Sequence, residues 1–237
     1  MLKEFAQYLV SLKPNQVYSI EGATYSDHDL ARVPKYIPRP RPCEVTGLDG
    51  VVKLIRTEAK KMPAPIMVRV KSPKEVDAFS ALDEDMERFP LCIAKSDVPG
   101  FQDGFRPYEA AIIELRSRYI PNADIDYLLD LLSRINKENG VTTNDNGVSQ
   151  TVEARSGISL KKMENIRPRV TLAPFRTFHE VEQPESEFLF RLDDDGDVGL
   201  FEADGGAWKQ AAKQNIYDYF ALTLAPEIEA GTVVVMM

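Results

Sequence analysis

The spacing of apolar residues predicts helices in six stretches of the chain. In the clearest case, Ile125, Leu128 and Leu132 lie three or four residues apart and form one apolar stripe. Another stretch opens with Ser72 and Pro73, a pair typical of a helix N-terminus. The predicted helices span residues 2–12, 46–61, 72–82, 107–120, 124–139 and 208–223.

Shorter apolar or alternating runs predict strands, most of them in the second half of the chain. They span residues 17–20, 66–70, 91–94, 148–152, 169–172, 187–192, 198–201 and 232–235. The turn-forming residues 193–197 join two of these strands and predict a β-hairpin. We therefore expect an α+β fold with mixed helices and a mainly antiparallel sheet, richer in β-structure toward the C-terminus.

The polar, turn-rich residues 141–147 are the best candidate for a domain boundary. They divide an N-terminal α/β lobe, residues 1–140, from a C-terminal lobe of hairpin and helix, residues 141–237. A chain of 237 residues also fits one continuous domain, and that alternative stays open.

Composition places the protein among ordinary globular chains, with 43% hydrophobic and 28% charged residues. Two cysteines are too few for a disulfide framework. Cys92 lies in an apolar run and is expected to be buried, whereas Cys43 follows a proline-rich segment and is expected at the surface. A disulfide between them is open. No run of about 20 apolar residues and no signal peptide is present, so we expect a soluble protein in the cytoplasm of a bacterial host cell.

Charge is concentrated in one segment, residues 180–204, which carries ten carboxylates and one base. The whole chain sums to −8, so this segment sets its electrostatic sign. Its second half offers the only carboxylates dense enough for a divalent cation: Asp193, Asp195, Asp197, Glu202 and Asp204. An EF-hand is excluded, because Arg191 would occupy the first ligand position. A hairpin turn followed by a helix cap explains the same residues and is favoured.

Four prolines between residues 34 and 42 predict an extended loop over residues 21–45. Within it, residues 30–43 form a basic arm that carries Arg32, Lys35, Tyr36, Arg39 and Arg41. One interpretation is an arm that docks on the acidic face of a second copy, formed by Glu180, Glu182, Glu185 and Glu187. A strand of bases with an aromatic residue is also typical of single-stranded nucleic-acid binding. A surface loop without a partner is the third possibility.

No catalytic motif is present, and we expect neither an enzyme nor a cofactor. The two histidines, His28 and His179, lie far apart in sequence and do not make a zinc pattern. Arg167, Arg169 and Arg176 form a second basic group near Phe175, and we expect these arginines on the solvent face of a strand.

Three segments carry a resemblance to a known family. They are the 48–55 helix after a Pro/Arg segment, residues 68–82 as a strand leading into a Phe-containing helix, and residues 167–172 preceding the 188–191 strand and a late helix. In this order of elements the chain resembles the YfdQ-like family of phage and prophage proteins. The resemblance implies a phage-encoded accessory protein, often beside recombination or replication genes, and carries over no functional residues.

Three functions follow from these observations. The leading hypothesis is a non-enzymatic phage accessory protein that self-assembles into a homo-oligomer through the basic arm. The first alternative is a factor that binds single-stranded nucleic acid or a recombination or replication protein. The second is a metal-dependent hydrolase that uses the acidic segment from Asp193 to Asp204. A membrane partner is not expected.

Overall fold

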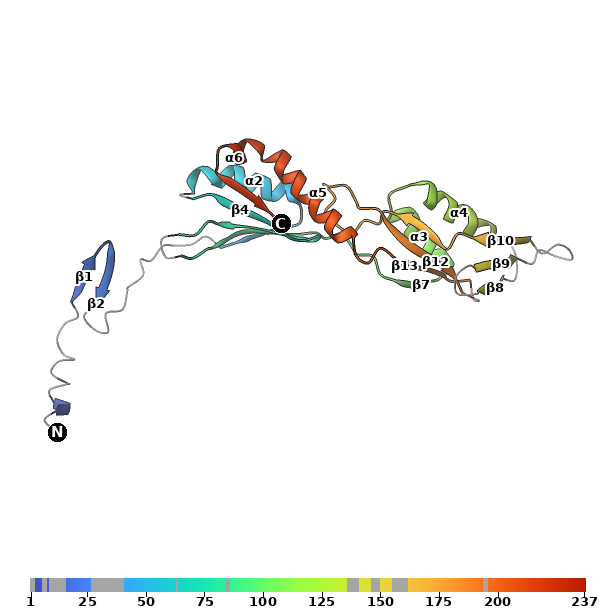
Figure 1. The fold of residues 1–237 in the computed structure, drawn as a ribbon, viewed down its shortest axis with the longest axis horizontal. Coiled ribbons are helices and arrows are strands. Elements are labelled where there is room, and N and C mark those ends of the chain that lie inside the picture. The colour runs from blue at the N-terminus through green and yellow to red at the C-terminus, as the bar shows by residue number, and fades with distance from the viewer. Residues whose placement is uncertain are drawn as a thin grey trace. The chain divides into compact units, whose positions relative to one another are not determined.

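The fold is known from a computed structural model that places two compact units. It describes residues 3–5, 8, 16–26, 41–62, 64–83, 86–135, 141–145, 150–154, 162–193 and 196–237. The first unit comprises Met1–Pro40 and Leu82–Glu87, and the second comprises Arg41–Ala81 and Arg88–Met237. The α+β fold class expected from the sequence is confirmed (Figure 1).

The first unit contains a two-stranded antiparallel hairpin of β1, Val17–Ile20, and β2, Ala23–Ser26. Its turn uses Glu21 and Gly22, both with positive φ. The predicted strand over 17–20 is confirmed, but the loop predicted to follow it is wrong at β2, which pairs with β1. Of the predicted helix over 2–12, residues 3–5 and 8 are helical and the other positions lie outside the described residues.

A five-stranded sheet forms one half of the second unit. Its strands are β3 Cys43–Val45, β4 Ile66–Ser72, β5 Glu75–Ser80, β6 Pro90–Lys95 and β14 Val233–Met236. The order is β14-β4-β5-β6-β3, in which β4, β5 and β6 are antiparallel and both outer strands are parallel to their neighbours. The two outer strands can be parallel to their neighbours because helices connect them to the sheet. Helix α2 follows β3 and precedes β4, and helices α5 and α6 precede β14, so each helical connection carries the chain back across the sheet.

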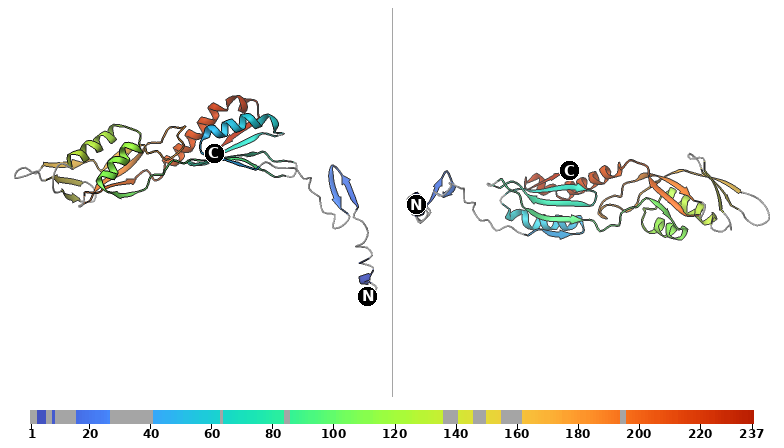
Figure 2. Two further views of the ribbon diagram at one scale, coloured as in Figure 1. Left: turned by 180° about the vertical axis from the view of Figure 1, so that it is seen from behind. Right: turned by 90° about the horizontal axis from the view of Figure 1, so that it is seen from below.

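Helices cover one face of this sheet. They are α2 Leu48–Glu58, continued by the short 3-10 turn Ala59–Lys61, then α5 Trp208–Thr223 and α6 Ala225–Glu229. Figure 1 and the views in Figure 2 place all of these helices on the same side of the strands. The core between them includes Ile55, Val68, Val76 and Phe220, all fully buried. The opposite face carries no helix from the described part of the chain.

A four-stranded antiparallel sheet forms the other half of the second unit. Its strands are β7 Gly104–Arg106, β11 Arg169–Leu172, β12 Ser186–Leu192 and β13 Val198–Glu202, in the order β11-β12-β13-β7. Helices α3, Tyr108–Ser117, and α4, Ala123–Ile135, pack against it through a second core. Leu115, Leu128, Phe188 and Phe190 are central to that core.

A three-stranded antiparallel sheet consists of β8 Val141–Asp145, β9 Gln150–Ala154 and β10 Lys162–Ile166. Residues 141–145, predicted as part of a polar link, are therefore a strand. The two larger sheets each combine strands from both sides of residues 141–147, since β7 pairs with β13 and β14 pairs with β4. None of the helices in the described part of the chain has both the length and the apolar character that a membrane crossing requires.

The helix predicted over 72–82 is wrong, because these residues form a tight turn and strand β5. The hydroxyl of Ser72 accepts the N–H of Lys74 at 3.2 Å, which closes the turn instead of capping a helix. In β5 every second residue is buried, namely Val76, Ala78 and Ser80. The two-residue alternation of a strand prevails over the helical spacing, because β4 and β6 both supply hydrogen-bond partners for the backbone of β5.

Tyr119 is a buried polar residue that the fold leaves unsatisfied. It is 3% exposed, and its hydroxyl has no hydrogen-bond partner among the described residues. Burial, and then the charge of Glu114, raise the pKa of Tyr119 above its ordinary value. As pH rises past about 10, the unfolded chain releases this proton before the folded chain does, so stability is lost with rising pH.

We therefore expect Tyr119→Phe to leave the free energy of unfolding unchanged at pH 7, or to raise it by at most about 1 kcal/mol. Above about pH 10 the variant should lose less stability than the wild type. Urea unfolding at both pH values measures this, with Tyr217→Phe, a half-buried tyrosine of α5, as the control. A variant less stable than the wild type at both pH values would contradict the argument.

Candidate functional site

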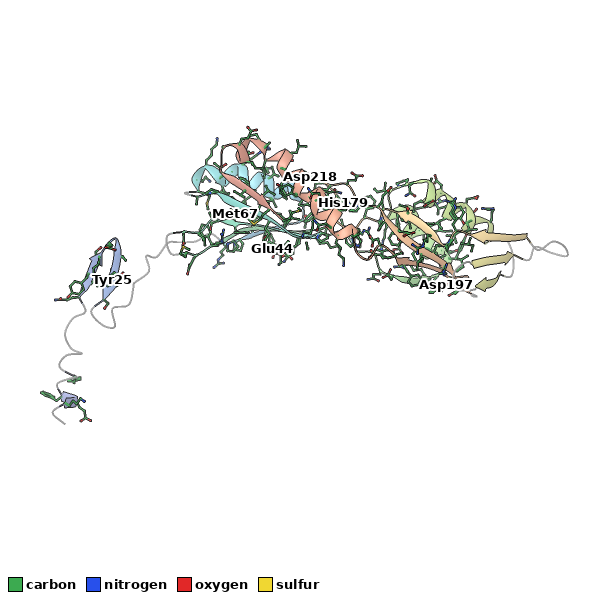
Figure 3. The ribbon with its side chains drawn as sticks, in the orientation of Figure 1. Tyr25, Glu44, Met67, His179, Asp197 and Asp218 are labelled. Atoms are coloured by element: carbon green, nitrogen blue, oxygen red, sulfur yellow. The ribbon has the colours of Figure 1, made fainter. Side chains whose placement is uncertain are left out.

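The helix-free face of the five-stranded sheet exposes a regular array of side chains. Because strand residues alternate between faces, the residues between the buried ones point away from the core. In Figure 3, Glu44 of β3 lies on the side of the sheet away from Asp218 of α5. The outward positions of the described strands include Glu44, Met67, Arg69, Lys71, Glu75, Asp77, Phe79, Ile93, Lys95 and Met236.

Ion pairs between acidic and basic side chains occupy much of this face. Arg69 contacts Asp77 through two of its nitrogens, and Lys71 Nζ lies 2.8 Å from Glu75 Oε1. Lys95 Nζ lies 3.0 Å from Glu44 Oε1 on the neighbouring strand. Pairs this exposed contribute little to stability, roughly 0–1 kcal/mol each. Their effect is to neutralise most of the charge on the face.

One group of residues on the face departs from this neutral pattern. The Phe79 ring has two guanidinium groups near it, with Cζ of Arg69 at 5.3 Å and Cζ of Arg88 at 5.5 Å from its centroid. These three residues, with Asp77, Pro90 and Met236, line an open depression of about 440 Å³. Among the described residues, Arg88 donates a long hydrogen bond, 3.4 Å, to the Ser80 carbonyl, and no carboxylate of that part of the chain pairs with it.

The depression combines two kinds of recognition. Its aromatic and apolar members, Phe79, Pro90 and Met236, offer a surface for a planar ring. The Arg88 guanidinium suits a phosphate or a carboxylate, since it donates several hydrogen bonds in fixed directions, whereas the Arg69 guanidinium is already held by Asp77. We call Arg69, Phe79 and Arg88 together the Arg–Phe–Arg site. The sequence does not reveal this site, because Arg69, Phe79 and Arg88 come from different parts of a β-meander in which the residue pattern predicts a helix.

The acidic hairpin tip forms a turn among the described residues. The Asp193 carboxylate accepts the N–H of Asp197 at 2.8 Å, and the Asp193 N–H donates to the Asp197 carbonyl at 3.1 Å. Asp195 lies outside the described residues. Within the described ranges, no three His, Cys, Asp or Glu side chains converge as metal ligands would. The geometry is that of a turn closed by its own aspartate.

Glu202 and Asp204 are both engaged in structural roles. Asp204 accepts the N–H groups of Gly206 at 2.9 Å and of Trp208 at 3.0 Å, so it caps the start of α5 as the sequence predicts. Glu202 Oε1 lies 2.6 Å from Arg176 Nη1, and its Oε2 accepts the indole N–H of Trp208 at 3.2 Å. These contacts leave the two carboxylates little freedom to serve a cation.

Arg176 is buried, contrary to the expectation of a solvent-facing arginine. It is 1% exposed and also donates to the Pro184 carbonyl at 3.2 Å and to the Ser186 hydroxyl. Its guanidinium lies 4.1 Å from the centroid of the Trp208 ring. Burial lowers the pKa of Arg176, and the Glu202 carboxylate opposes that shift. The neighbouring Phe178 is also buried, so this segment runs through the interior.

The four glutamates predicted as an acidic docking face have different roles. Glu180 Oε1 accepts the N–H of Leu48 at 2.7 Å and so caps α2, whose own flanking residue, Gly47, has no side chain to do so. Glu187 pairs with Arg169 at 2.8 Å. Glu182 and Glu185 are exposed.

The predicted arm lies mostly outside the described residues. Of its five named residues, Arg32, Lys35, Tyr36 and Arg39 fall there, and Arg41 is described and exposed. His28 also lies outside the described residues, whereas His179 is exposed, with its ring 5.5 Å from that of Phe175.

Comparisons with protein-family models, with curated proteins and with solved structures find no match to this chain.

The ion pair of Arg176 and Glu202 makes a clear prediction about stability. Removing the carboxylate in Glu202→Ala leaves a guanidinium buried without its counter-charge, so we expect a loss of about 3 kcal/mol in the free energy of unfolding. Glu185→Ala, at an exposed glutamate nearby in sequence, should change it by less than about 0.5 kcal/mol. Urea unfolding at neutral pH compares the two. Equal effects from both variants would show that the ion pair is unimportant.

Proposed function

We propose that the protein is a non-enzymatic accessory protein of phage type that self-assembles through its N-terminal segment. The observation that carries this proposal is the hairpin β1–β2. Its apolar side chains remain in solvent, with Val17 62%, Tyr18 45% and Ile20 56% exposed. A two-stranded hairpin is at best marginally stable alone in water and needs a further strand or a packed face.

Further exposed apolar residues precede the hairpin in sequence. Phe5 is 60% and Tyr8 59% exposed. Apolar residues grouped in this way are typical of interaction surfaces rather than of scattered surface positions. The N-terminal segment therefore presents several anchors for a partner, and not only the Pro/Arg residues that first suggested an arm.

A second copy of the chain is the partner that charge favours. Residues 1–40 carry five bases and four acids, so the rest of the chain holds the negative charge. Glu182 and Glu185, both exposed, keep part of that charge available at the surface. Opposite charge steers association and fixes its register more than it sets affinity, and the exposed apolar residues supply the affinity. The phage origin rests only on the resemblance in the order of elements, and one of its three segments, the Phe-containing helix after residue 72, is replaced by strand β5.

Replacing the hairpin anchors tests this proposal. We expect the wild type to run as a homo-oligomer in light scattering at micromolar concentration, and Val17→Ser with Ile20→Ser to shift it toward the monomer. The matched control is Ile113→Ser with Leu222→Ser, which removes two exposed apolar residues, 66% and 81% exposed, from helices α3 and α5. The control should keep the wild-type mass. A monomeric wild type would overturn the proposal.

A second candidate function is the binding of single-stranded nucleic acid, and the Arg–Phe–Arg site favours it. The half-buried Phe79 ring on an open sheet face can stack a base, and Arg88, which pairs with no carboxylate of the described residues, can contact a phosphate. The whole-chain charge of −8 opposes wide backbone binding, so the site suits one or two nucleotides. No observation favours the metal-dependent hydrolase, because Glu202 and Asp204 are held by Arg176 and by the start of α5.

Fluorescence anisotropy with a labelled oligothymidine at low salt tests this second candidate. We expect Phe79→Ala to weaken binding at least about fivefold, the loss of one stacked base. Arg88→Gln should reduce the slope of affinity against salt by about 1. Lys71→Gln is the control, because Lys71 lies on the same sheet face in an ion pair with Glu75. No binding by the wild type would remove this candidate.

A further inference from the structure

The two cysteines of the chain meet in the five-stranded sheet. Cys43 lies on the edge strand β3 and Cys92 on the adjacent strand β6, and they are direct partners in the parallel register. Direct partners on adjacent strands project to the same face of a sheet. Adjacent strands lie about 4.8 Å apart, within the range of Cα separations that disulfides span. The fold thus brings together two thiols that are far apart in sequence.

The two thiols have opposite environments. Cys92 is fully buried in the core beneath α2, and Cys43 is exposed; both are free thiols. Burial raises the pKa of the Cys92 thiol to about 12, and its contact with the Cys43 thiol adds to that shift. The contact supports the proximity that the strand register implies. An accessible thiol beside a buried partner has the arrangement of a reactive cysteine and a resolving one.

We propose that Cys43 and Cys92 form a dithiol site that a low-molecular-weight disulfide, such as glutathione disulfide, oxidises to an intramolecular disulfide. Cys43 reacts first because it is accessible: its thiolate attacks the small disulfide, whose S–S bond breaks as a mixed disulfide forms and one small thiolate leaves. The Cys92 thiol then attacks the Cys43 sulfur as it loses its proton, and the second small thiolate leaves and takes up a proton. Two cysteine thiols and one small disulfide are thereby converted into one protein disulfide and two small thiols.

The disulfide would act on the most weakly held strand of the sheet. Strand β3 has three residues and hydrogen-bonds only to β6 among the described strands. It is also the first strand of the second unit, directly after Arg41 and Pro42. A covalent bond to β6 would fasten the point at which the N-terminal segment joins this unit. Oxidation would therefore restrict local opening at β3 and leave the core unchanged.

Mass spectrometry of the full-length protein after treatment with glutathione disulfide tests the proposal. The wild type should lose two hydrogens, resist alkylation at both cysteines and yield a peptide linking Cys43 to Cys92. Cys92→Ser should stop at the mixed disulfide on Cys43. Cys43→Ser should remain unmodified, because the buried thiol is not reached. Treatment with a small dithiol reductant should restore both thiols of the wild type.

Hydrogen exchange adds a readout of the structural effect. The amides of residues 43–45 should exchange at least about tenfold more slowly in the oxidised wild type than in the reduced form. The glutathionylated Cys92→Ser variant should not show this protection. A wild type that stops at the mixed disulfide, or that forms only a disulfide between two chains through Cys43, would overturn the proposal.

Discussion

The second unit depends on one buried cation, Arg176. Its guanidinium contacts Glu202 of β13, the Ser186 hydroxyl of β12 and the Trp208 ring of α5, so strands of one sheet and the helix that packs on the other meet around it. Burying a charge is favourable only when partners replace the lost water, and here a carboxylate, a carbonyl, a hydroxyl and an aromatic ring replace much of it, while Nε has no hydrogen-bond partner among the described residues. The requirement to satisfy this group fixes where the segment from Arg176 to Ser186 runs.

Residues next to Arg176 also link the five-stranded sheet to the four-stranded sheet. The Thr177 hydroxyl donates to the Pro73 carbonyl, and the Thr177 carbonyl accepts from Ser96 at 3.3 Å. Phe178 enters the core of the five-stranded sheet, whereas Phe188 belongs to the core of the four-stranded sheet. The side chain of Gln183 accepts the N–H groups of Arg176 and Thr177, which satisfies a buried stretch without regular pairing. A polar network therefore holds this connection where no ladder of strands does.

The sequence predicted helices α2, α3, α4 and α5 and most of the longer strands, because each of these elements carries its own period. Helix α5 has the predicted bounds, and β4, β6, β11, β12, β13 and β14 lie where the patterns put them. The prediction was wrong at strand β5 because Val76 and Phe79 are spaced as on a helix. Only the pairing with both flanking strands shows that these residues alternate as in a strand. Strands β3 and β7 are too short for any pattern, and each is defined by its partner.

The sites were less predictable than the fold, because they depend on register between distant segments. Sequence alone could identify the acidic residues but not their partners: Glu180 caps α2, a helix far away in sequence, and Glu202 neutralises a buried arginine. The same limit applies to Arg69 and Phe79, which are brought together by the β4–β5 register, and to Cys43 and Cys92. The sequence carries a signal for the burial of Arg176, since Phe175 and Phe178 flank it and mark an interior segment, but the charge of the arginine favours solvent exposure.

Strand β3 follows the N-terminal segment in the chain and also carries one of the two thiols. Residues 1–40 hold the exposed apolar hairpin, and the chain enters the second unit through Arg41, Pro42 and then Cys43. An edge strand of three residues is easily opened, so any force that a docked N-terminal segment exerts on the sheet acts first on β3. The thiol pair lies at that strand, and a bond there would resist the opening without altering the hairpin itself. Assembly and oxidation would then be coupled through the local stability of β3, and neither would require a contact between the two sites.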